Sequence, residues 1–424
     1  MKVLVVGGGG REHALVWKLS QSRHVDKIYC SPGNAGISEI AECIDIGISN
    51  FDRLVDFVKY EWVDLTVVGP EEPLSKGIVN AFEREGRRIL GPTQEAAQLE
   101  SSKVFCKDFM KRYGIPTAEY SVFTSHFHAE DHVRMKGTPI VIKASGLAAG
   151  KGVFVTHTMD EAVRALRLIM KEKVFGEAGE KVVVEEYLEG EEASFMAFLD
   201  GKTIIPMASS QDHKRVFDGD EGPNTGGMGA YSPAPVVTRE LEVIIMERIM
   251  WPTMRGLRSE GITYNGILYA GLMIRDGLPY VLEFNCRLGD PETQPVLSRL
   301  DSDFFDISVA VIDGRLSETA VRWRKEPSIC VVLASKGYPG TYEKGKVISG
   351  LEELKGQKDL FVFHAGTSFQ NGSLVTSGGR VLGVTALGTD MREARERAYS
   401  AIEKIHFEGM HFRKDIAHRA LERE

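Results

Sequence analysis

Residues 139–153 read PIVIKASGLAAGKGV. The apolar run Ile140–Ile142 ends in Lys143, small residues and glycines follow, and Lys151 precedes a second apolar segment that begins at Val153. This pattern predicts two strands joined by a flexible hairpin that carries two lysines. Glycine-rich backbone can close its N–H groups around an anion, and lysine offers a point charge to phosphate oxygens. The Walker spacing and its helix are missing, so the stretch predicts a different phosphate-facing hairpin; a hairpin with solvated lysines is the alternative.

The composition is that of a globular protein with several domains. A length of 424 residues predicts roughly two to four folding units of ~100–200 residues. The formal net charge of −8 leaves no basic footprint for nucleic acid. No apolar run is long enough for a membrane helix, and residues 1–6 lead into glycines without a signal-peptide core. The five cysteines lack zinc-ligand or CxxC spacing, so we expect reduced thiols. Together, these features predict a cytoplasmic protein that binds neither nucleic acid nor membranes.

The N-terminal region begins like a nucleotide-binding α/β domain. An apolar strand at residues 2–6 is followed by Gly7–Gly10 and a helical pattern at residues 11–19. A dinucleotide site is disfavoured because the glycine frame that starts at Gly7 has Glu12 at its third position, and the second strand ends in Cys30-Ser31 without an acid for the ribose. In a parallel sheet the strand ends share one edge, so their loops are predicted to line one crevice: residues 7–11, 32–36 and 69–71.

The fold class predicted for the whole chain is a multidomain mixture of α/β and α+β units. The expected domains are an N-terminal parallel-sheet domain at residues 1–100, a central region at 101–315 with a mobile subdomain of about 120–188, and a small α+β domain at 325–424. The last follows a polar link and contains apolar strands and a helix at its end. Gly378-Gly379-Arg380 precedes one of these strands and is interpreted mainly as a turn; a position at the ligand crevice is the alternative.

Acidic residues follow a buried strand in the central region. The segment VVVEEYL at residues 182–188 turns acidic at Glu185 and Glu186, and Glu192 follows shortly after. Buried carboxylates are costly without partners, so these residues favour a donor-rich ligand such as an adenosine. A surface acidic patch at a strand end explains this segment equally well.

A long polar segment covers residues 211–235, QDHKRVFDGDEGPNTGGMGAYSPAP. Its glycines and turn residues predict an ordered loop without regular secondary structure, and such loops are usually functional. Asp212, Lys214 and Arg215 place an acid beside two cations. This combination suits a small zwitterion or a phosphate.

The segment LPYVLEFNCRLG at residues 278–289 predicts a metal and anion site. Residues two apart in a strand share a face, so Glu283, Asn285 and Arg287 are expected to project together while Phe284 and Cys286 face the core. Two oxygen ligands suit Mg²⁺ with bound phosphates, and the guanidinium suits a carboxylate or a transferring phosphoryl group. Asp290-Pro291-Glu292 extends the acidic site. An amphipathic strand that faces water is the alternative.

Blocks along nearly the whole chain resemble the phosphoribosylamine–glycine ligases, which are ATP-grasp enzymes of purine biosynthesis. These blocks are long and rich in uncommon residues: GGGGREHAL, SPGNAG, GPEEPL, VIKASGLAAGKGV, VVVEEYLEGEEAS, QDHKR with DGDEGPNTGGMGAYSPAP, and LEFNCRLGDPETQ. The resemblance implies a central ATP-grasp fold of two subdomains. Small departures occur at Ser31-Pro32 and Ser101-Ser102-Lys103, and Gly271–Met273 lies where many ATP-grasp enzymes carry another metal acid. The number of metal ions and any third ligand therefore stay open.

The resemblance also implies a set of site residues. The loop 144–152, with Gly150 and Lys151, would be a mobile cover over ATP. A divalent cation, Mg²⁺ or Mn²⁺, would be held by Glu283 and Asn285. The remaining ATP contacts implied are Lys103 and Lys143 to the phosphates, Glu185 to the adenine amino group, the backbone of Glu186 and Leu188 to the hinge side of the base, and Glu192 to the ribose.

The activity implied is the ligation of glycine to 5-phosphoribosylamine through a glycyl phosphate. We expect Arg287 to orient the glycine carboxylate and to offset charge during transfer, and Asp212 to hold the ammonium group. Lysines, with Lys214 among the expected catalytic residues, would spread the remaining charge. The ribosyl phosphate would lie near the N-terminal glycine loop, and the residues expected there are Gly10, Arg11, Asn34 and Glu71.

We expect a monomer or weak dimer, with a transient contact to the preceding enzyme of the pathway. An ATP-grasp ligase with a different acceptor is the nearest alternative. An oxidoreductase would depend on Gly7–Gly10 alone, and a non-catalytic nucleotide sensor would leave Glu283, Asn285 and Arg287 unexplained.

Overall fold

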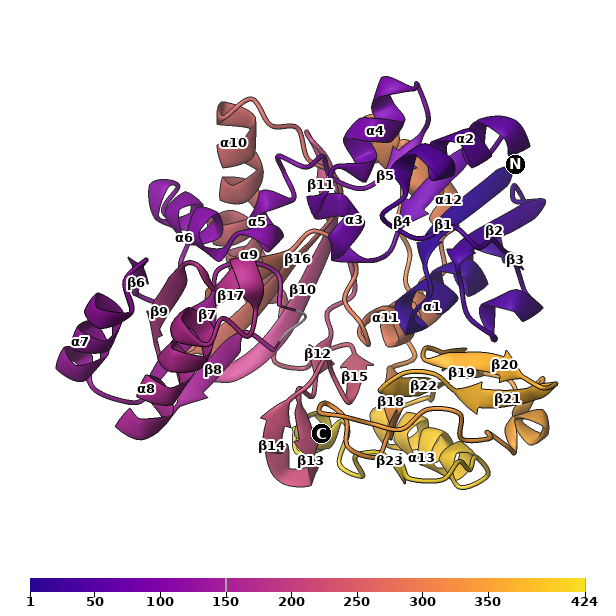
Figure 1. Cartoon of the computed structure of the whole chain (residues 1–424). Coiled ribbons are helices and arrows are strands. Elements are labelled where there is room, and N and C mark those ends of the chain that lie inside the picture. The colour runs from indigo at the N-terminus through magenta and orange to yellow at the C-terminus, as the bar shows by residue number, and fades with distance from the viewer. Residues whose placement is uncertain (149–150, 424) are drawn as a thin grey trace.

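The computed structural model describes residues 1–148 and 151–423 and arranges them in lobes around a shared centre (Figure 1). The N-terminal lobe contains a five-stranded sheet of order β3-β2-β1-β4-β5, whose strands all run parallel. This confirms the predicted parallel-sheet domain. Its strands are β1 (Lys2–Gly7), β2 (Lys27–Pro32), β3 (Glu42–Cys43), β4 (Leu65–Val68) and β5 (Ile89–Leu90). The main helices of this lobe are α1 (Gly10–Leu19), α2 (Phe51–Glu61), α3 (Glu71–Ser75) and α4 (Ile78–Arg84).

A small lobe projects at the left of Figure 1 and contains the lysine-bearing hairpin. Its four-stranded sheet has the order β6-β9-β7-β8, and Lys143 on β7 lies opposite Val153 on β8, as the sequence predicted. The apolar faces of its two helices close a separate core. The elements are β6 (Tyr120–Phe123), β7 (Ile140–Ala144), β8 (Val153–Thr156), β9 (Val182–Glu186), α7 (His126–Lys136) and α8 (Met159–Leu166).

The central sheet has the antiparallel order β11-β10-β16-β17 and faces the small lobe. Its strands are β10 (Glu191–Asp200), β11 (Ile204–Pro206), β16 (Asn265–Arg275) and β17 (Leu278–Asn285). A helical segment packs beside this sheet and consists of α9 (Arg239–Ile245), a π-helical turn at Met246–Met250, and α10 (Trp251–Ser259). Short α5 (Gln98–Ser101) precedes α6 (Lys103–Arg112), whose N-terminus is capped by Ser102, since its hydroxyl accepts from the Phe105 N–H.

The sheet of the C-terminal lobe includes two strands from the polar segment 211–235. Its strand order is β12-β15-β18-β22-β19, with β23 added beside β18. The segment was predicted to lack regular structure, and this was wrong, because its turn residues connect short strands: β12 (Gln211–Asp212), β13 (Arg215–Phe217), β14 (Glu221–Asn224) and β15 (Gly229–Ser232). The other elements are β18 (Ser328–Ser335), β19 (Leu360–His364), β20 (Thr367–Gln370), β21 (Ser373–Thr376), β22 (Arg380–Leu387), β23 (Met410–His411), α13 (Met391–Ile402) and α14 (His418–Leu421).

Two helices join the lobes behind the site. Helix α11 (Thr293–Arg299) is buried along its whole length and contacts α1, β18 and β22, while α12 (Phe304–Ile312) contacts β10 and β16. The segment 286–292, which carries charged residues, runs directly from β17 into α11. It therefore lies where all the lobes except the small one converge. Among the described residues, no helix is both long and apolar enough to cross a membrane.

Candidate active site

One cavity of about 650 Å³ lies between the small lobe, the central sheet and the two terminal lobes. It brings together most of the residues that the sequence singled out. The predicted residues that line it are Arg11, Glu71, Lys103, Lys143, Glu185, Glu186, Leu188, Glu192, Asp212, Lys214, Glu283, Asn285 and Arg287. Lys151, Gly10 and Asn34 do not line this cavity, and Gly150 lies outside the described residues.

Glu185 is the centre of a buried charge cluster at the floor of the small lobe. Its Oε2 lies 2.9 Å from Lys107 Nζ and 3.0 Å from Lys143 Nζ, and all three side chains are buried. Burial alone would raise the pKa of Glu185, but the two ammonium groups outweigh it and lower that pKa. Glu185 Oε1 is also buried and has no hydrogen-bond partner among the described residues. This oxygen is therefore free to accept from a ligand.

Lys107 also belongs to the site, although it was not among the predicted residues. Lys107 follows Lys103 by four residues on α6, so both lie on one face of the helix, and both line the cavity. Lys107 Nζ also donates to Thr117 Oγ1 at 2.7 Å. Burial lowers the pKa of Lys107, and the Glu185 carboxylate opposes this.

Arg287 is held by two acids that come from the first hundred residues. Its Nη2 lies 2.8 Å from Glu100, its Nε lies 3.4 Å from Glu71, and Nη2 donates to Asn285 Oδ1 at 3.2 Å. Burial by itself would lower the pKa of Arg287, but Glu100 and Glu71 raise it above its usual value. Glu100 also accepts from the Cys286 N–H at 2.8 Å. Nothing in the local sequence around Glu100 marked it as a site residue.

Glu283, Asn285 and Arg287 were predicted to share one strand, but only Glu283 and Asn285 lie in β17. Strand β17 ends at Asn285 and contains an irregularity in its pairing with β16, so Arg287 lies beyond the strand. All three side chains nevertheless line the cavity; Phe284 and Cys286 are buried, although Phe284 also borders the cavity. The bulge and the turn after β17 thus preserve the common direction that alternation predicted.

Two buried carboxylates, Asp212 and Glu292, face the same cavity. Glu292 Oε1 accepts from Tyr269 Oη at 2.6 Å and from Ser194 Oγ at 3.3 Å. The Asp212 carboxylate has neither a hydrogen bond nor an ion pair with any described residue. Among the described residues, no lysine, arginine or histidine nitrogen lies within 4.0 Å of the carboxylate oxygens of Asp212 or Glu292. Burial raises the pKa of Asp212 to about 7, with Glu292 adding to the rise and Lys214 opposing it. The pair is suited to a cationic ligand.

Lys214 and Glu192 form an ion pair on the wall of the cavity. The Lys214 Nζ lies 2.6 Å from Glu192 Oε2. Burial would lower the pKa of Lys214, but Glu192 and Asp212 raise it well above its usual value. Lys214 therefore stays charged beside the acids that surround it.

Glu283 and Asn285 offer the oxygen atoms that a hard divalent cation prefers. Both line the cavity, and the Glu283 carboxylate makes no ion pair within 4.0 Å among the residues the structure describes. Burial raises the pKa of Glu283, but Lys214, Lys143 and Lys103 together lower it, so the group is an anion. The donor set fits Mg²⁺ or Mn²⁺.

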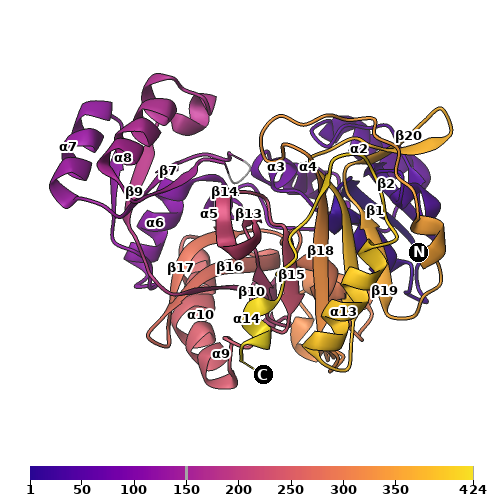
Figure 2. The ribbon, with the colours of Figure 1, turned by 90° about the horizontal axis from the view of Figure 1, so that it is seen from below.

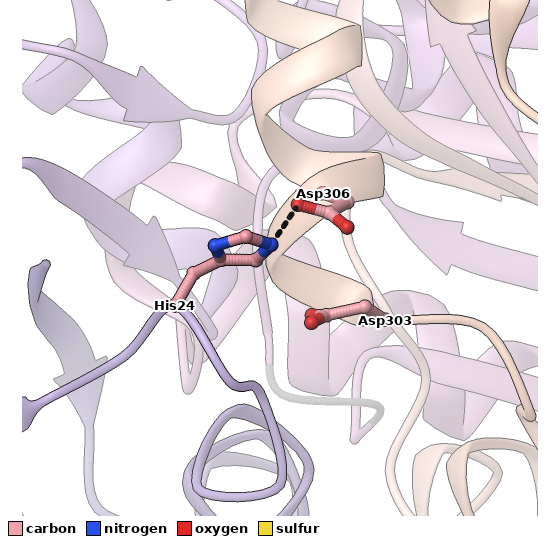
Figure 3. Close-up of side chains that lie close together, drawn as sticks. All are labelled: His24, Asp303 and Asp306. Carbon is pink, nitrogen blue, oxygen red and sulfur yellow. Dashed lines mark ion pairs between the residues drawn. The ribbon is translucent and has the colours of Figure 1, made fainter.

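A second group of potential metal ligands lies elsewhere and is better explained as a contact between lobes. His24, Asp303 and Asp306 place one ligating atom each within 4.8 Å of one another (Figure 3). His24 Nε2 is 3.5 Å from Asp306 Oδ1, but Arg23 Nε lies 3.2 Å from the same ring nitrogen. Both oxygens of Asp303 are also occupied, by the Phe305 N–H and Ser22 Oγ.

In the N-terminal glycine loop, the carboxylate of Glu12 contacts the backbone at the start of α1. Glu12 Oε2 accepts from the Gly9 N–H at 2.6 Å, and Glu12 Oε1 accepts from Arg11 Nε at 2.7 Å. A Cβ at Gly7 or Gly69 would collide with the Glu12 side chain. The carboxylate therefore compensates the helix N-terminus where a dinucleotide fold binds pyrophosphate, which explains why the fingerprint glycine is replaced.

The other residues predicted for the ribosyl phosphate have structural partners. Asn34 Nδ2 donates to Gly8 O at 3.0 Å and to His364 O at 2.8 Å, which links two lobes. Gly10 packs against Gln294, where a Cβ would approach to 2.7 Å. Arg11 and Glu71 do line the cavity. A phosphate subsite at Gly10 and Asn34 stays a prediction.

Arg380 is a cavity residue that had been interpreted mainly as part of a turn. Its Nη2 lies 2.7 Å from Asp290 Oδ2, and its Nη1 donates to Asp290 O at 2.6 Å and to Gly226 O. The arginine thus ties the C-terminal lobe to the segment that carries Arg287 and Glu292. The basic residue directly after two glycines was the available signal.

Comparison with known proteins places this geometry in a family. Three models of the phosphoribosylglycinamide synthetase family match the chain: the N domain at residues 1–100, the ATP-grasp (A) domain at 101–293 and the C domain at 328–419. The chain is 54% identical to the phosphoribosylamine–glycine ligase of Vibrio cholerae over 429 aligned positions, which cover 100% of the chain and 99% of that protein. It is 53% identical to the Escherichia coli K12 enzyme of the same name, with 100% of both chains covered.

Solved structures agree with the family models. The crystal structure of phosphoribosylamine–glycine ligase from Thermotoga maritima superposes with a TM-score of 0.84 at 35% identity, over 98% of this chain and 100% of that one. A biotin carboxylase from Campylobacter jejuni superposes with a TM-score of 0.74 at 16% identity, over 99% and 95% of the two chains. The second likeness concerns the fold alone. The expected ATP-grasp architecture is confirmed by the family model that matches residues 101–293.

Proposed function

The chain belongs to the phosphoribosylglycinamide synthetase family, and we propose that it ligates glycine to 5-phosphoribosylamine with ATP. The products are glycinamide ribonucleotide, ADP and phosphate. The reaction is a step of purine biosynthesis. The observation that carries the proposal is the single cavity in which phosphate-facing lysines, unpaired buried acids and a fixed arginine meet. A zwitterionic amino acid and a nucleoside triphosphate need this combination of charges.

The proposed ATP subsite lies between the small lobe and the central sheet. Lys103 and Lys143 line the cavity beside the glycine-rich hairpin and are suited to phosphate oxygens. The free Oε1 of Glu185 is an acceptor for the adenine amino group. Backbone groups of Glu186 and Leu188, which line the same wall, would contact the edge of the base. The ribose is assigned to Glu192, and Gly150 and Lys151 to the loop that covers the phosphates.

Glu283 and Asn285 would hold Mg²⁺ or Mn²⁺. When bound there, the cation supplies positive charge to the phosphate oxygens of ATP. The protein's own contribution is the charge around that place. Although burial would raise the pKa of Glu283, the charges of Lys214, Lys143 and Lys103 lower it and keep the carboxylate ionised.

Glycine is proposed to lie between Arg287 and the buried acids. The Arg287 guanidinium, already fixed by Glu100 and Glu71, would orient the substrate carboxylate. Asp212 would take the substrate ammonium, because its buried carboxylate is otherwise without a partner among the described residues. Lys214 offsets the negative charge that builds up during transfer.

The chemistry has two steps that need no side-chain nucleophile. A carboxylate oxygen of glycine attacks the γ-phosphorus of ATP, the bond to the β-phosphate oxygen breaks, and ADP leaves. The amine of 5-phosphoribosylamine then attacks the acyl carbon of glycyl phosphate, and phosphate leaves as the amide forms and the nitrogen loses a proton. The residues of the cavity bind and orient the reactants, so positioning and electrostatics supply most of the rate enhancement.

We assign 5-phosphoribosylamine to the side of the cavity formed by the N-terminal lobe. Arg11 and Glu71 line that side and are suited to the phosphate and to the ribose hydroxyls or amine. Gly10 and Asn34 complete the proposed set. We also propose a monomer or weak dimer in the cytoplasm that contacts the preceding enzyme transiently; all five cysteines are free, in keeping with a reducing compartment.

The deciding experiment is phosphate release from ATP and Mg²⁺ with glycine and freshly generated 5-phosphoribosylamine, added singly and together. Rapid release is expected only when both are present. Release with glycine and a different amine, but not with 5-phosphoribosylamine, would assign the chain to another acceptor. Release that does not depend on glycine would contradict the proposal.

A further inference from the structure

The last residues of the chain run along the β13–β14 hairpin, which follows directly after Asp212 and Lys214. After β23 the chain passes the hairpin and reaches α14, which lies below the β13–β14 hairpin in the view of Figure 2. His411 Nε2 lies 2.8 Å from Val216 O. Arg419 of α14 lines the same cavity as the proposed substrate residues. The C-terminal segment 411–423 is therefore part of the surroundings of the site.

A buried arginine is the strongest link between this segment and the hairpin. Arg413 is 0% exposed, and its Nη1 donates to Asp220 Oδ1 at 2.7 Å and to Arg215 O at 3.1 Å. Its Nε and Nη2 donate to both oxygens of Asp415, at 2.8 and 2.7 Å. Asp415 Oδ2 in turn accepts from the Gly219 N–H at 2.9 Å. Asp220 and Asp415 are partly exposed, but Arg413 is fully buried. The network favours a single arrangement, because a shift of either acid would leave the buried charge of Arg413 unpaired.

A second link acts on the residue between Asp212 and Lys214. His213 is 0% exposed and does not line the cavity, whereas its two neighbours do, so they point to opposite sides. The His213 Nε2 accepts from the Ala417 N–H at 3.1 Å. Burial lowers the pKa of His213 to about 4, which keeps the ring neutral and able to accept near neutral pH.

The donor of that hydrogen bond has an unusual backbone. Ala417 has φ of +67°, a left-handed conformation that residues with a Cβ rarely adopt. Its side chain is 0% exposed, and the neighbouring Ile416 packs where a Cβ at Gly229 would collide with it. Such a conformation persists only where the surroundings determine it, and here it directs the N–H at His213.

We propose that the C-terminal segment 411–423 is a positioning element of the substrate site, which holds Asp212 and Lys214 in place through Ala417–His213 and Arg413–Asp220. The inference rests on the proposed function, in which these two residues hold glycine and offset charge. The proposed adenine contacts of ATP belong to the small lobe, whereas Glu192, assigned to the ribose, pairs with Lys214. Loss of the C-terminal contacts should therefore affect glycine more than ATP.

The test replaces His213 in two ways. His213→Leu removes the acceptor for the Ala417 N–H, whereas the amide oxygen of His213→Gln can still accept it. We expect His213→Leu to raise the KM for glycine about tenfold while the KM for ATP changes less than about twofold. His213→Gln should restore the KM for glycine most of the way to that of the unmodified protein. An unchanged KM for glycine in His213→Leu, or an equal rise in both variants, would overturn the proposal.

If His213→Leu does not fold, the kinetics of Asp415→Asn test the same proposal. Asp415 does not line the cavity, yet it holds Arg413 and the Gly219 N–H. We expect a rise in the KM for glycine of about threefold and faster hydrogen exchange in residues 215–220. Arg397→Gln is the matched control, because it breaks the ion pair with Glu393 on α13 in the same lobe without touching the hairpin. An unchanged KM for glycine in Asp415→Asn contradicts the inference.

Asp212→Asn separates this inference from the proposed function. If Asp212→Asn leaves the KM for glycine unchanged, the assignment of Asp212 to glycine is wrong. If Asp212→Asn raises the KM for glycine but His213→Leu and Asp415→Asn do not, only the role of the C-terminal segment is wrong.

Discussion

The guanidinium of Arg287 lies 2.8 Å from the carboxylate of Glu100, and both side chains are largely shielded from solvent. Glu100 is the last but one residue of α5, whereas Arg287 follows the last strand of the central sheet. The same carboxylate accepts the Cys286 N–H, so it fixes the turn as well as the side chain. This contact makes the orientation of the proposed glycine carboxylate site depend on the end of the N-terminal region.

Glu100→Gln should lower kcat/KM for glycine by about tenfold or more, because Arg287 keeps a hydrogen-bond partner but loses the buried opposite charge. Arg287→Ala should lower it further, by ~10²-fold or more, because it removes the group that contacts the substrate. Steady-state kinetics with glycine varied at saturating ATP is the measurement. Near-normal turnover in Arg287→Ala would remove this arginine from the mechanism.

Glu185→Gln should raise the KM for ATP by about tenfold, because the neutral amide cannot compensate the buried charges of Lys107 and Lys143. The midpoint of thermal unfolding should fall for the same reason. Glu180→Gln, an exposed acid of the same lobe, is the matched control and should change neither quantity. A KM for ATP that stays within twofold in Glu185→Gln would argue against the adenosine assignment.

Tyr269→Phe should weaken the glycine site and the fold together. The Tyr269 hydroxyl donates to the buried Glu292 carboxylate at 2.6 Å, and loss of a hydrogen bond to a charged group costs about 1.5–3 kcal/mol. We expect a lower free energy of unfolding in urea and a KM for glycine raised several-fold. Tyr264→Phe, which removes a buried hydroxyl that donates to Ile267 O, should reduce stability without changing the KM for glycine. Equal kinetics in the two variants would show that Glu292 is structural only.

Two histidines between the terminal lobes should make the fold less stable in mild acid. His13 Nδ1 accepts from the His364 N–H at 2.8 Å, and burial lowers the pKa of His13 to about 3 and of His364 to about 4. The unfolded chain, with pKa values near 6.5, therefore binds more protons below that pH. Their stabilising contribution is complete above pH 6.5 and is lost as pH falls towards 4.

Urea unfolding at pH 8 and pH 5.5 measures this effect. The loss expected on acidification is about 1.4 kcal/mol for each histidine, from one pH unit of differential protonation. His13→Asn keeps an acceptor for the His364 N–H but cannot titrate, so its pH dependence should be smaller by one such increment. The same slope in His13→Asn and the unmodified protein would contradict the assignment to His13.

Much of the fold could be predicted because its signals are local. The alternation around Lys143 and Val153 specified a hairpin, and the glycines after β1 specified the start of an α/β lobe. The segment 211–235 was misjudged because its strands are only two to four residues long. They pair with one another, β12 with β15 and β13 with β14, and β15 also pairs with the distant β18. Short strands carry too few residues for a periodic pattern to be visible.

The sequence by itself determined which chemical groups are present at the ends of its strands, and it specified the family through blocks such as VIKASGLAAGKGV and LEFNCRLGDPETQ. Only the tertiary structure decided which of these groups meet. Lys107 with Glu185, Glu100 with Arg287, Asp290 with Arg380 and Asp220 with Arg413 are all pairs between separate elements. The physical reason is that backbone periodicity relates residues two to four positions apart, whereas a buried charge finds its partner wherever packing of the lobes brings one.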